Sequence, residues 1–173
     1  AWPWQVSCTA SRGPWTVVAG IGGNLTVFAS ADFAQRRAHR FGADEIKNIA
    51  FVGGPDRLVA AAGRELLLLD VATGATLARQ SALGAAVECV AAMDDGSAVV
   101  WGEASGVVAV WDLVEDRVQP LFVHPAPVRA IAVHPDGRHV ATACRDRGIA
   151  LLRRGVGRPI AEQVLQNELP QSL

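Results

Sequence analysis

Short runs of alternating hydrophobic residues, separated by turn residues, recur along the whole chain. The clearest example lies in Val128–Arg154, which contains the runs VRAIAV, RHVATAC and IALLRR. HPDG joins the first two runs and RDRG joins the second to the third. Proline and glycine favour tight turns between apolar runs. The pattern therefore predicts three short β-strands connected by two hairpin turns.

The same pattern occurs three more times upstream. The first apolar residues of the four units are Val6, Ile46, Val87 and Val128, so the spacings by subtraction are 40, 41 and 41 residues. A period of about 40–45 residues with four strands per unit is typical of propeller blades. We predict an all-β fold, a β-propeller with four blades of four antiparallel strands each. The blades are expected at about 1–41, 42–82, 83–123 and 124–166, with 167–173 as a C-terminal tail.

The last strand of the fourth unit has an alternative. PIAEQVLQNEL places Ile160, Val164, Leu165 and Leu169 at a spacing that fits a helix, which Pro159 could begin. Comparison with the earlier units favours an outer strand over Pro159–Gln166, and we expect the strand.

One dipeptide connects this pattern to a known family. Trp111-Asp112 ends the third strand of the third unit, and the turns MDDG and HPDG follow the first strands of units three and four. With the period, these residues make nearly the whole chain resemble the WD-repeat (tryptophan–aspartate repeat) family of β-propellers. At the positions of Trp111-Asp112, the other units hold Phe28-Ala29, Leu69-Asp70 and Leu152-Arg153.

The resemblance implies a hydrogen-bonded His, Ser/Thr, Asp and Trp set that locks a blade. The fourth unit matches three of these positions with His124, Thr142 and Asp146, and has Leu152 at the Trp position. We expect a structural lock there that ends at Thr142. A hydrolase triad of the same three residues is disfavoured because Thr142 lies in the middle of a strand, not on an exposed elbow.

Neither a metal site nor a cofactor is expected. His134 and His139 flank a Pro-Asp-Gly turn, and the sequence shows no accompanying ligands at a recognised metal-binding spacing. We interpret them as solvated turn residues. The acidic turns around Asp94 and Asp112 lack the spacing of a calcium loop.

Composition narrows the choice of partner and compartment. With 16 Lys and Arg against 17 Asp and Glu, the net charge is −1, which gives no long-range attraction to nucleic acid or an anionic membrane. No apolar run approaches the ~18 residues of a membrane span. The opening AWPWQ does not match a signal peptide, and we expect none. Cys8, Cys89 and Cys144 sit in apolar runs as free thiols would, which favours a reducing, cytoplasmic setting.

Turns provide the candidate partner contacts. Arg12, Trp15, Arg145 and Arg147 are of residue types enriched at interface hot spots. Trp15 fits the core equally well because it begins a strand. The basic clusters around Arg36 and Arg145 are mainly expected to keep sheet edges soluble. The alternative is a basic patch that binds an acidic partner.

Propellers have about 4–8 blades, and the resembled family usually has about seven. Four blades with the curvature of that family would therefore close only part of a ring. We predict a non-catalytic protein-interaction scaffold, completed by further blades of a longer parent chain or by another subunit. A homodimer could also form an eight-bladed ring. The alternatives are a regulatory or sensor region of a larger enzyme-containing protein (kinase, protease or ATPase), and a complete four-bladed propeller with a ligand or ion in its channel.

Overall fold

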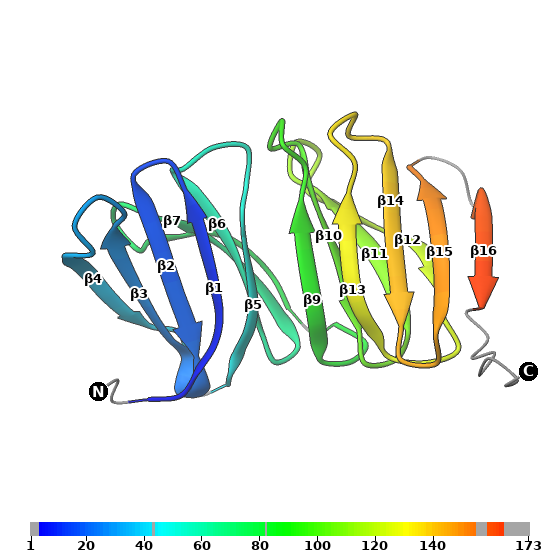
Figure 1. Cartoon of the computed structure of the whole chain (residues 1–173), viewed down its shortest axis with the longest axis horizontal. Coiled ribbons are helices and arrows are strands. Elements are labelled where there is room, and N and C mark those ends of the chain that lie inside the picture. Colours follow the sequence, from blue (N-terminus) through cyan, green and yellow to red (C-terminus); the bar gives the residue numbers. More distant parts are fainter. Residues whose placement is uncertain (1–3, 43, 82, 155–158, 165–173) are drawn as a thin grey trace, which may run out of the picture.

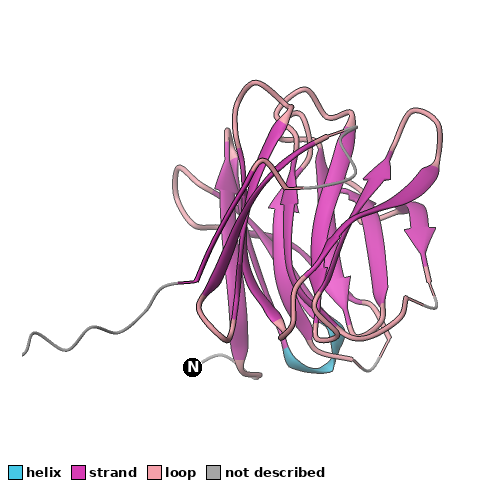
Figure 2. Ribbon diagram, turned by 90° about the vertical axis from the view of Figure 1, so that its right-hand side faces the viewer, coloured by secondary structure: helices cyan, strands magenta, loops and turns pink. Residues whose placement is uncertain are grey.

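This computed structural model describes residues 4–42, 44–81, 83–154 and 159–164. Within them lie sixteen β-strands and one short 3-10 turn, and Figure 2 shows the strands joined by loops. The strands of the first two sheets are β1 (Val6–Arg12), β2 (Trp15–Gly20), β3 (Asn24–Ala29), β4 (Gln35–Arg40), β5 (Ile46–Phe51), β6 (Arg57–Ala62), β7 (Glu65–Asp70) and β8 (Thr76–Gln80). Those of the last two are β9 (Val87–Ala92), β10 (Ala98–Glu103), β11 (Val107–Asp112), β12 (Arg117–Val123), β13 (Val128–Val133), β14 (His139–Cys144), β15 (Gly148–Arg153) and β16 (Ala161–Val164). The turn η1 (Ile21–Gly23) connects β2 to β3.

Each sheet contains four consecutive strands that pair antiparallel with their neighbours in the chain. We call the sheets blades 1 to 4. The predicted all-β fold with four-stranded blades is confirmed. The outer strand β16 forms over Ala161–Val164. Of the predicted stretch Pro159–Gln166, Pro159 and Ile160 precede the strand, and Leu165 and Gln166 lie outside the described residues.

The middle strands of the central blades are hydrophobic on both faces because neighbouring blades cover both. In β10, all six residues of AVVWGE are buried, and in β7 the four leucines of ELLLLD are buried. A strand covered on both sides reads as a continuous apolar run. The core therefore consists of three separate clusters, one at each junction between consecutive blades.

The blades form an open arc. The inner strands β1, β5, β9 and β13 pack against one another in that order, and Figure 1 shows them side by side across the middle of the view. Among the described residues, no strand of blade 1 makes an extensive contact with a strand of blade 4, and the chain does not close a ring. One face of each end blade is therefore left without a neighbouring blade.

Every inner strand contains a bulge near its start. The pairing register shifts between Val6 and Cys8 in β1, and equivalent shifts occur in β5, β9 and β13. The extra residues in the four strands are Ser7, Lys47, Glu88 and Arg129. Because a bulge leaves one residue unpaired and re-aims its side chain, the same irregularity presents one residue per blade along the inner edge of the arc.

The predicted MDDG and HPDG turns form between the first and second strands of blades 3 and 4. Gly96 and Gly137 adopt φ angles of 72° and 65° there. This left-handed conformation is available to glycine at little cost, which explains its place at the end of both turns.

Candidate functional site

His124 and Thr142 form a buried junction between blades 3 and 4. His124 follows β12 and is 3 % exposed, and Thr142 lies in β14 and is 2 % exposed. The His124 Nε2 and Thr142 Oγ1 atoms are 2.8 Å apart. Thr142 Oγ1 also donates to the carbonyl oxygen of Ala150 at 3.4 Å, so the Nε2–H tautomer of His124 completes the chain of bonds. Burial lowers the pKa of His124, while Glu162 acts in the opposite direction.

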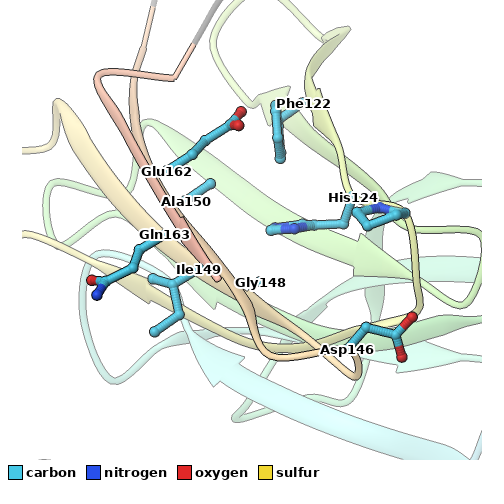
Figure 3. A pocket seen from close by; sticks show the side chains of 9 residues that line it. Phe122, His124, Asp146, Gly148, Ile149, Ala150, Glu162 and Gln163 are labelled. Atoms are coloured by element: carbon cyan, nitrogen blue, oxygen red, sulfur yellow. The ribbon is translucent and has the colours of Figure 1, made fainter. Parts of the chain in front are cut away.

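Asp146 lies outside this pair. It is exposed in the turn between β14 and β15, and Figure 3 shows its carboxylate away from the His124 ring. No hydrogen bond of Asp146 occurs among the described residues. The structure therefore joins two of the three predicted lock residues and leaves the third in solvent, because the turn carries the Asp146 side chain away from the junction.

A cavity of about 350 Å³ opens beside the junction, between the end of β12 and the outer half of blade 4 (Figure 3). Phe122, His124, Ala150 and Glu162 line it together with Pro125, Asp146, Gly148, Ile149 and Gln163. Phe122 packs edge-on against His124, with ring centroids 4.8 Å apart. The Thr142 hydroxyl is buried and fully engaged, so it offers no nucleophile to this cavity.

Two buried tryptophans of blade 3, one of them in the Trp-Asp marker, belong to polar networks that motif spacing did not reveal. Trp111 Nε1 donates to Asp116 Oδ1 at 2.8 Å, and Trp101 Nε1 donates to Glu103 Oε1 at 3.2 Å. Glu103 is 4 % exposed and its other oxygen accepts the backbone N–H of Ala85 at 3.0 Å. Each buried indole therefore has an acidic partner.

Asp112 organises the end of the same strand. Its Oδ1 accepts the backbone N–H groups of Val114 and Glu115, both at 3.0 Å, and these bonds, together with Arg154, hold its pKa below the usual range. Arg154, which follows β15, bonds to Asp112 Oδ2 and to Ser97 Oγ. This contact ties blade 4 to blade 3 on the surface.

The bulge residues form a charged row that we call the inner-edge row: Ser7, Lys47, Glu88 and Arg129. Lys47 Nζ lies 2.7 Å from one oxygen of Glu88, and Arg129 Nη1 lies 3.0 Å from the other. The Glu88 side chain is only 12 % exposed, and Ser7 bonds to Glu45 instead. Sequence reasoning missed this row, although its residues recur at the repeat spacing.

Two of the predicted contact residues, Arg12 and Trp15, make contacts within the chain. Arg12 pairs with Asp94 at 3.2 Å, which links the first turns of blades 1 and 3. Trp15 is half-buried against the core cluster between blades 1 and 2. Arg145 and Arg147 are exposed in the turn that also holds Asp146.

Blade 4 presents an uncovered apolar face, which we call the open face: Ala130, Ala132, Ala141, Ala143, Ile149 and Leu151. Cross-strand pairing places Ala141 opposite Ala132 and Leu151, and Ala143 opposite Ala130 and Ile149. Directly paired residues project from the same side of a sheet. Ile149 and Leu151 are 36 % and 39 % exposed. The opposite side of the blade packs against blade 3.

The free face of blade 1 is more polar. Thr9, Ser11 and Thr16 project from it, with Val18 and Phe28 between them. The hydroxyls of Ser11 and Thr16 are 3.0 Å apart, and Thr16 is also 3.0 Å from Ser30. The two ends of the arc therefore differ in chemistry.

Among the described residues, no helix is both long and apolar enough to cross a membrane.

Comparison with known proteins supports the repeat assignment. No protein-family model matches the chain. A WD repeat-containing protein, SL1-17 of Schistosoma mansoni, is 33 % identical over 104 residues. The matched region covers 58 % of this chain but only 34 % of the relative, so the chain spans about a third of that protein's length.

Proposed function

We propose that the chain is a set of WD-repeat blades, as its four-stranded sheets and its similarity to a WD repeat-containing protein support, and one part of a larger propeller that serves as a non-catalytic protein-interaction scaffold. Further blades of a parent chain, or another subunit, complete the ring. The blade limits of about 1–41, 42–82, 83–123 and 124–166 belong to this proposal. So does a cytoplasmic location, which the free state of Cys8, Cys89 and Cys144 supports.

The observation that carries the proposal is the open face of blade 4. Each of its six residues lies 41 positions after a residue of blade 3 that faces blade 4: Cys89, Ala91, Val100, Gly102, Val108 and Val110. Cys89, Val100, Val108 and Val110 belong to the core cluster that blade 4 covers. The open face is thus the repeat equivalent of a covered face.

The charges of the inner-edge row also support a further blade next to blade 4. Glu88 is paired on both sides, by Lys47 from blade 2 and by Arg129 from blade 4. The Arg129 side chain is 51 % exposed and lies in the terminal inner strand. A further blade that continued the row would bring its own bulge residue next to Arg129, and an acidic residue would suit that position.

The junction chemistry supports a non-catalytic role. Thr142, the one hydroxyl in the His124 set, is buried and bonded to His124 and to a backbone carbonyl. Loops and cavity walls therefore offer contacts for recognition. Of the predicted contact residues, Arg145 and Arg147 are the exposed ones that remain available to a protein partner.

Thiol labelling tests the proposal. Ala141→Cys places a reactive group on the open face, and Val114→Cys is the control because Val114 is 81 % exposed in a turn. Burial raises the pKa of Cys8 to about 12 and that of Cys89 to about 11, so these two native thiols react slowly.

We expect the thiol of the Ala141→Cys variant to be protected in the full-length parent protein and labelled in the isolated 173-residue chain. The thiol of the Val114→Cys variant should be labelled in both. Equal labelling of the Ala141→Cys variant in the two proteins would contradict the proposal.

A further inference from the structure

Three potential metal ligands meet at the first hairpin of blade 4. His134 precedes the turn, Asp136 lies within it, and His139 begins β14. One ligand atom from each residue lies within 4.8 Å of the other two. The spacing His-x-Asp-x-x-His adds the turn's aspartate to the two histidines, which separately carry no metal signature.

The carboxylate of Asp136 is fixed by the backbone. Its Oδ1 accepts the N–H groups of Arg138 at 2.7 Å and His139 at 3.1 Å. The other oxygen, Oδ2, lies 2.6 Å from His139 Nδ1 and 3.2 Å from His134 Nδ1. The two N–H bonds hold the carboxylate in place in the turn, and Oδ2 stays directed at both histidines.

The distances approach those of a bound ion. At Zn–N and Zn–O bond lengths of about 2.0–2.2 Å, two ligand atoms of a tetrahedral ion lie roughly 3.3 Å apart. The 3.2 Å separation is close to this value, and the 2.6 Å separation is a hydrogen bond that lengthens when an ion enters between the two atoms. The ring planes of the two histidines are nearly perpendicular, at 85°, with centroids 6.1 Å apart. The side chains are 63 %, 34 % and 35 % exposed in sequence order, so small rotations can open the space.

We propose that His134, Asp136 and His139 form a binding site for one divalent transition-metal ion, with Zn²⁺ as the fitting physiological ion. Two imidazoles and one carboxylate suit a borderline ion better than Ca²⁺ or Mg²⁺, which prefer oxygen ligands. Three protein ligands leave a fourth position for water or for a group from a partner. Binding displaces the Asp136 N–H that now donates to His134 Nδ1 at 3.2 Å.

The proposed metal site lies at the edge of the open face of blade 4. His134 and His139 also border a hollow of about 280 Å³, which Ala132, Ala141 and Leu151 of the open face line as well. An ion held here would lie beside the surface that a covering partner reaches. The site itself is built from one hairpin, so it does not depend on the proposed ring completion.

Calorimetric titration of the 173-residue chain with ZnCl₂, and visible absorption with CoCl₂, tests the site. The variants are His134→Gln, His139→Gln and Asp136→Asn. Asparagine keeps an oxygen that can accept the Arg138 and His139 N–H bonds and removes the charge. His39→Gln is the control, because it removes an imidazole from a blade 1 strand, far along the sequence from the hairpin. Thermal unfolding without metal checks that each variant is folded.

We expect one ion per chain, with an affinity that falls by about tenfold or more in each of the three cluster variants and is unchanged in His39→Gln. Absence of Zn²⁺ and Co²⁺ binding by the folded chain would overturn the site. So would cluster variants that bind as tightly as the unsubstituted chain, or a His39→Gln variant that loses the same affinity.

Discussion

The hydroxyl of Thr142 is the only hydrogen-bonding partner of the buried His124 Nε2 among the described residues. Thr142→Val keeps the shape of the side chain but leaves that nitrogen unsatisfied. We expect the free energy of unfolding to fall by about 1–3 kcal/mol, measured by urea denaturation. Thr76→Val in β8 is the matched control because Thr76 is exposed. It should change stability by less than about 0.5 kcal/mol. Equal effects of the two changes would show that the junction contributes nothing specific.

The same histidine makes stability depend on pH. Burial lowers the pKa of His124 below its ordinary value of 6.5, and it lowers that of His39 too. Below pH 6.5 the unfolded chain binds protons more readily than the folded chain, so stability falls with pH until the folded histidines also protonate. We expect unfolding free energy to decrease as the pH is lowered from about 7 through 6.5, and His124→Gln to reduce this slope. An unchanged slope in that variant would contradict the account.

Repeat spacing relates residues inside strands more closely to the structure than residues in turns. Thr142 and His124 are placed by strand register, which the repeat period determines. Asp146 depends on the conformation of the β14–β15 turn, where Arg147 adopts a positive φ of 65°. The direction of a turn side chain depends on that local geometry, which the period does not encode. For the same reason, spacing does not group Asp136 with the two histidines that flank its turn.

At the scale of the strand, the inner-edge row should stabilise the packing of blades 2, 3 and 4. Glu88→Gln removes the charge that Lys47 and Arg129 share. Both pairs are partly exposed through Lys47 and Arg129. Surface ion pairs contribute about 0.2–1 kcal/mol each, so we expect a loss of about 1 kcal/mol that shrinks at high salt. Glu115→Gln is the control, because the Glu115 and Arg117 side chains are 59 % and 61 % exposed. A salt-independent loss would mean that packing, not charge, explains the effect.

The strands could be predicted from the sequence, whereas the bulges could not. Alternation of apolar residues and the recurring turns place each strand within a few residues, because both signals are local. A bulge adds one residue to a strand without changing its composition, so Lys47 and Glu88 read as ordinary solvent-facing positions. Their alignment becomes visible only when the inner strands lie side by side.

At the scale of the whole molecule, the composition of the open face keeps the free-energy cost of its exposure to water small. Four of its six residues are alanines. Full burial of an Ile or Leu side chain is worth about 1.5–3 kcal/mol, and Ile149 and Leu151 are already about two-thirds buried. Covering both contributes on the order of 1–2 kcal/mol by the same measure. An isolated arc should therefore associate weakly, and its association should depend on concentration.

The period indicated four blades and the resemblance implied an incomplete ring, and the arc has four blades and no closure. The identity of what completes the ring could not be predicted, because an apolar face attracts any complementary apolar face. The hydroxyl-rich face of blade 1, with Thr9 and Thr16, was equally hidden. Threonine suits strands on either side of a sheet, so its presence did not distinguish a covered face from a free one.

The central claim is that these four blades are an open arc that requires another surface to cover it. Light scattering across a range of concentrations measures this most directly, with Leu151→Lys as the paired variant because the lysine charge blocks the open face. We expect the mass of the 173-residue chain to rise above 18.2 kDa with concentration, and the variant to remain closer to the monomer. A cooperatively folded 18.2 kDa monomer at every concentration, unaffected by Leu151→Lys, would contradict the account.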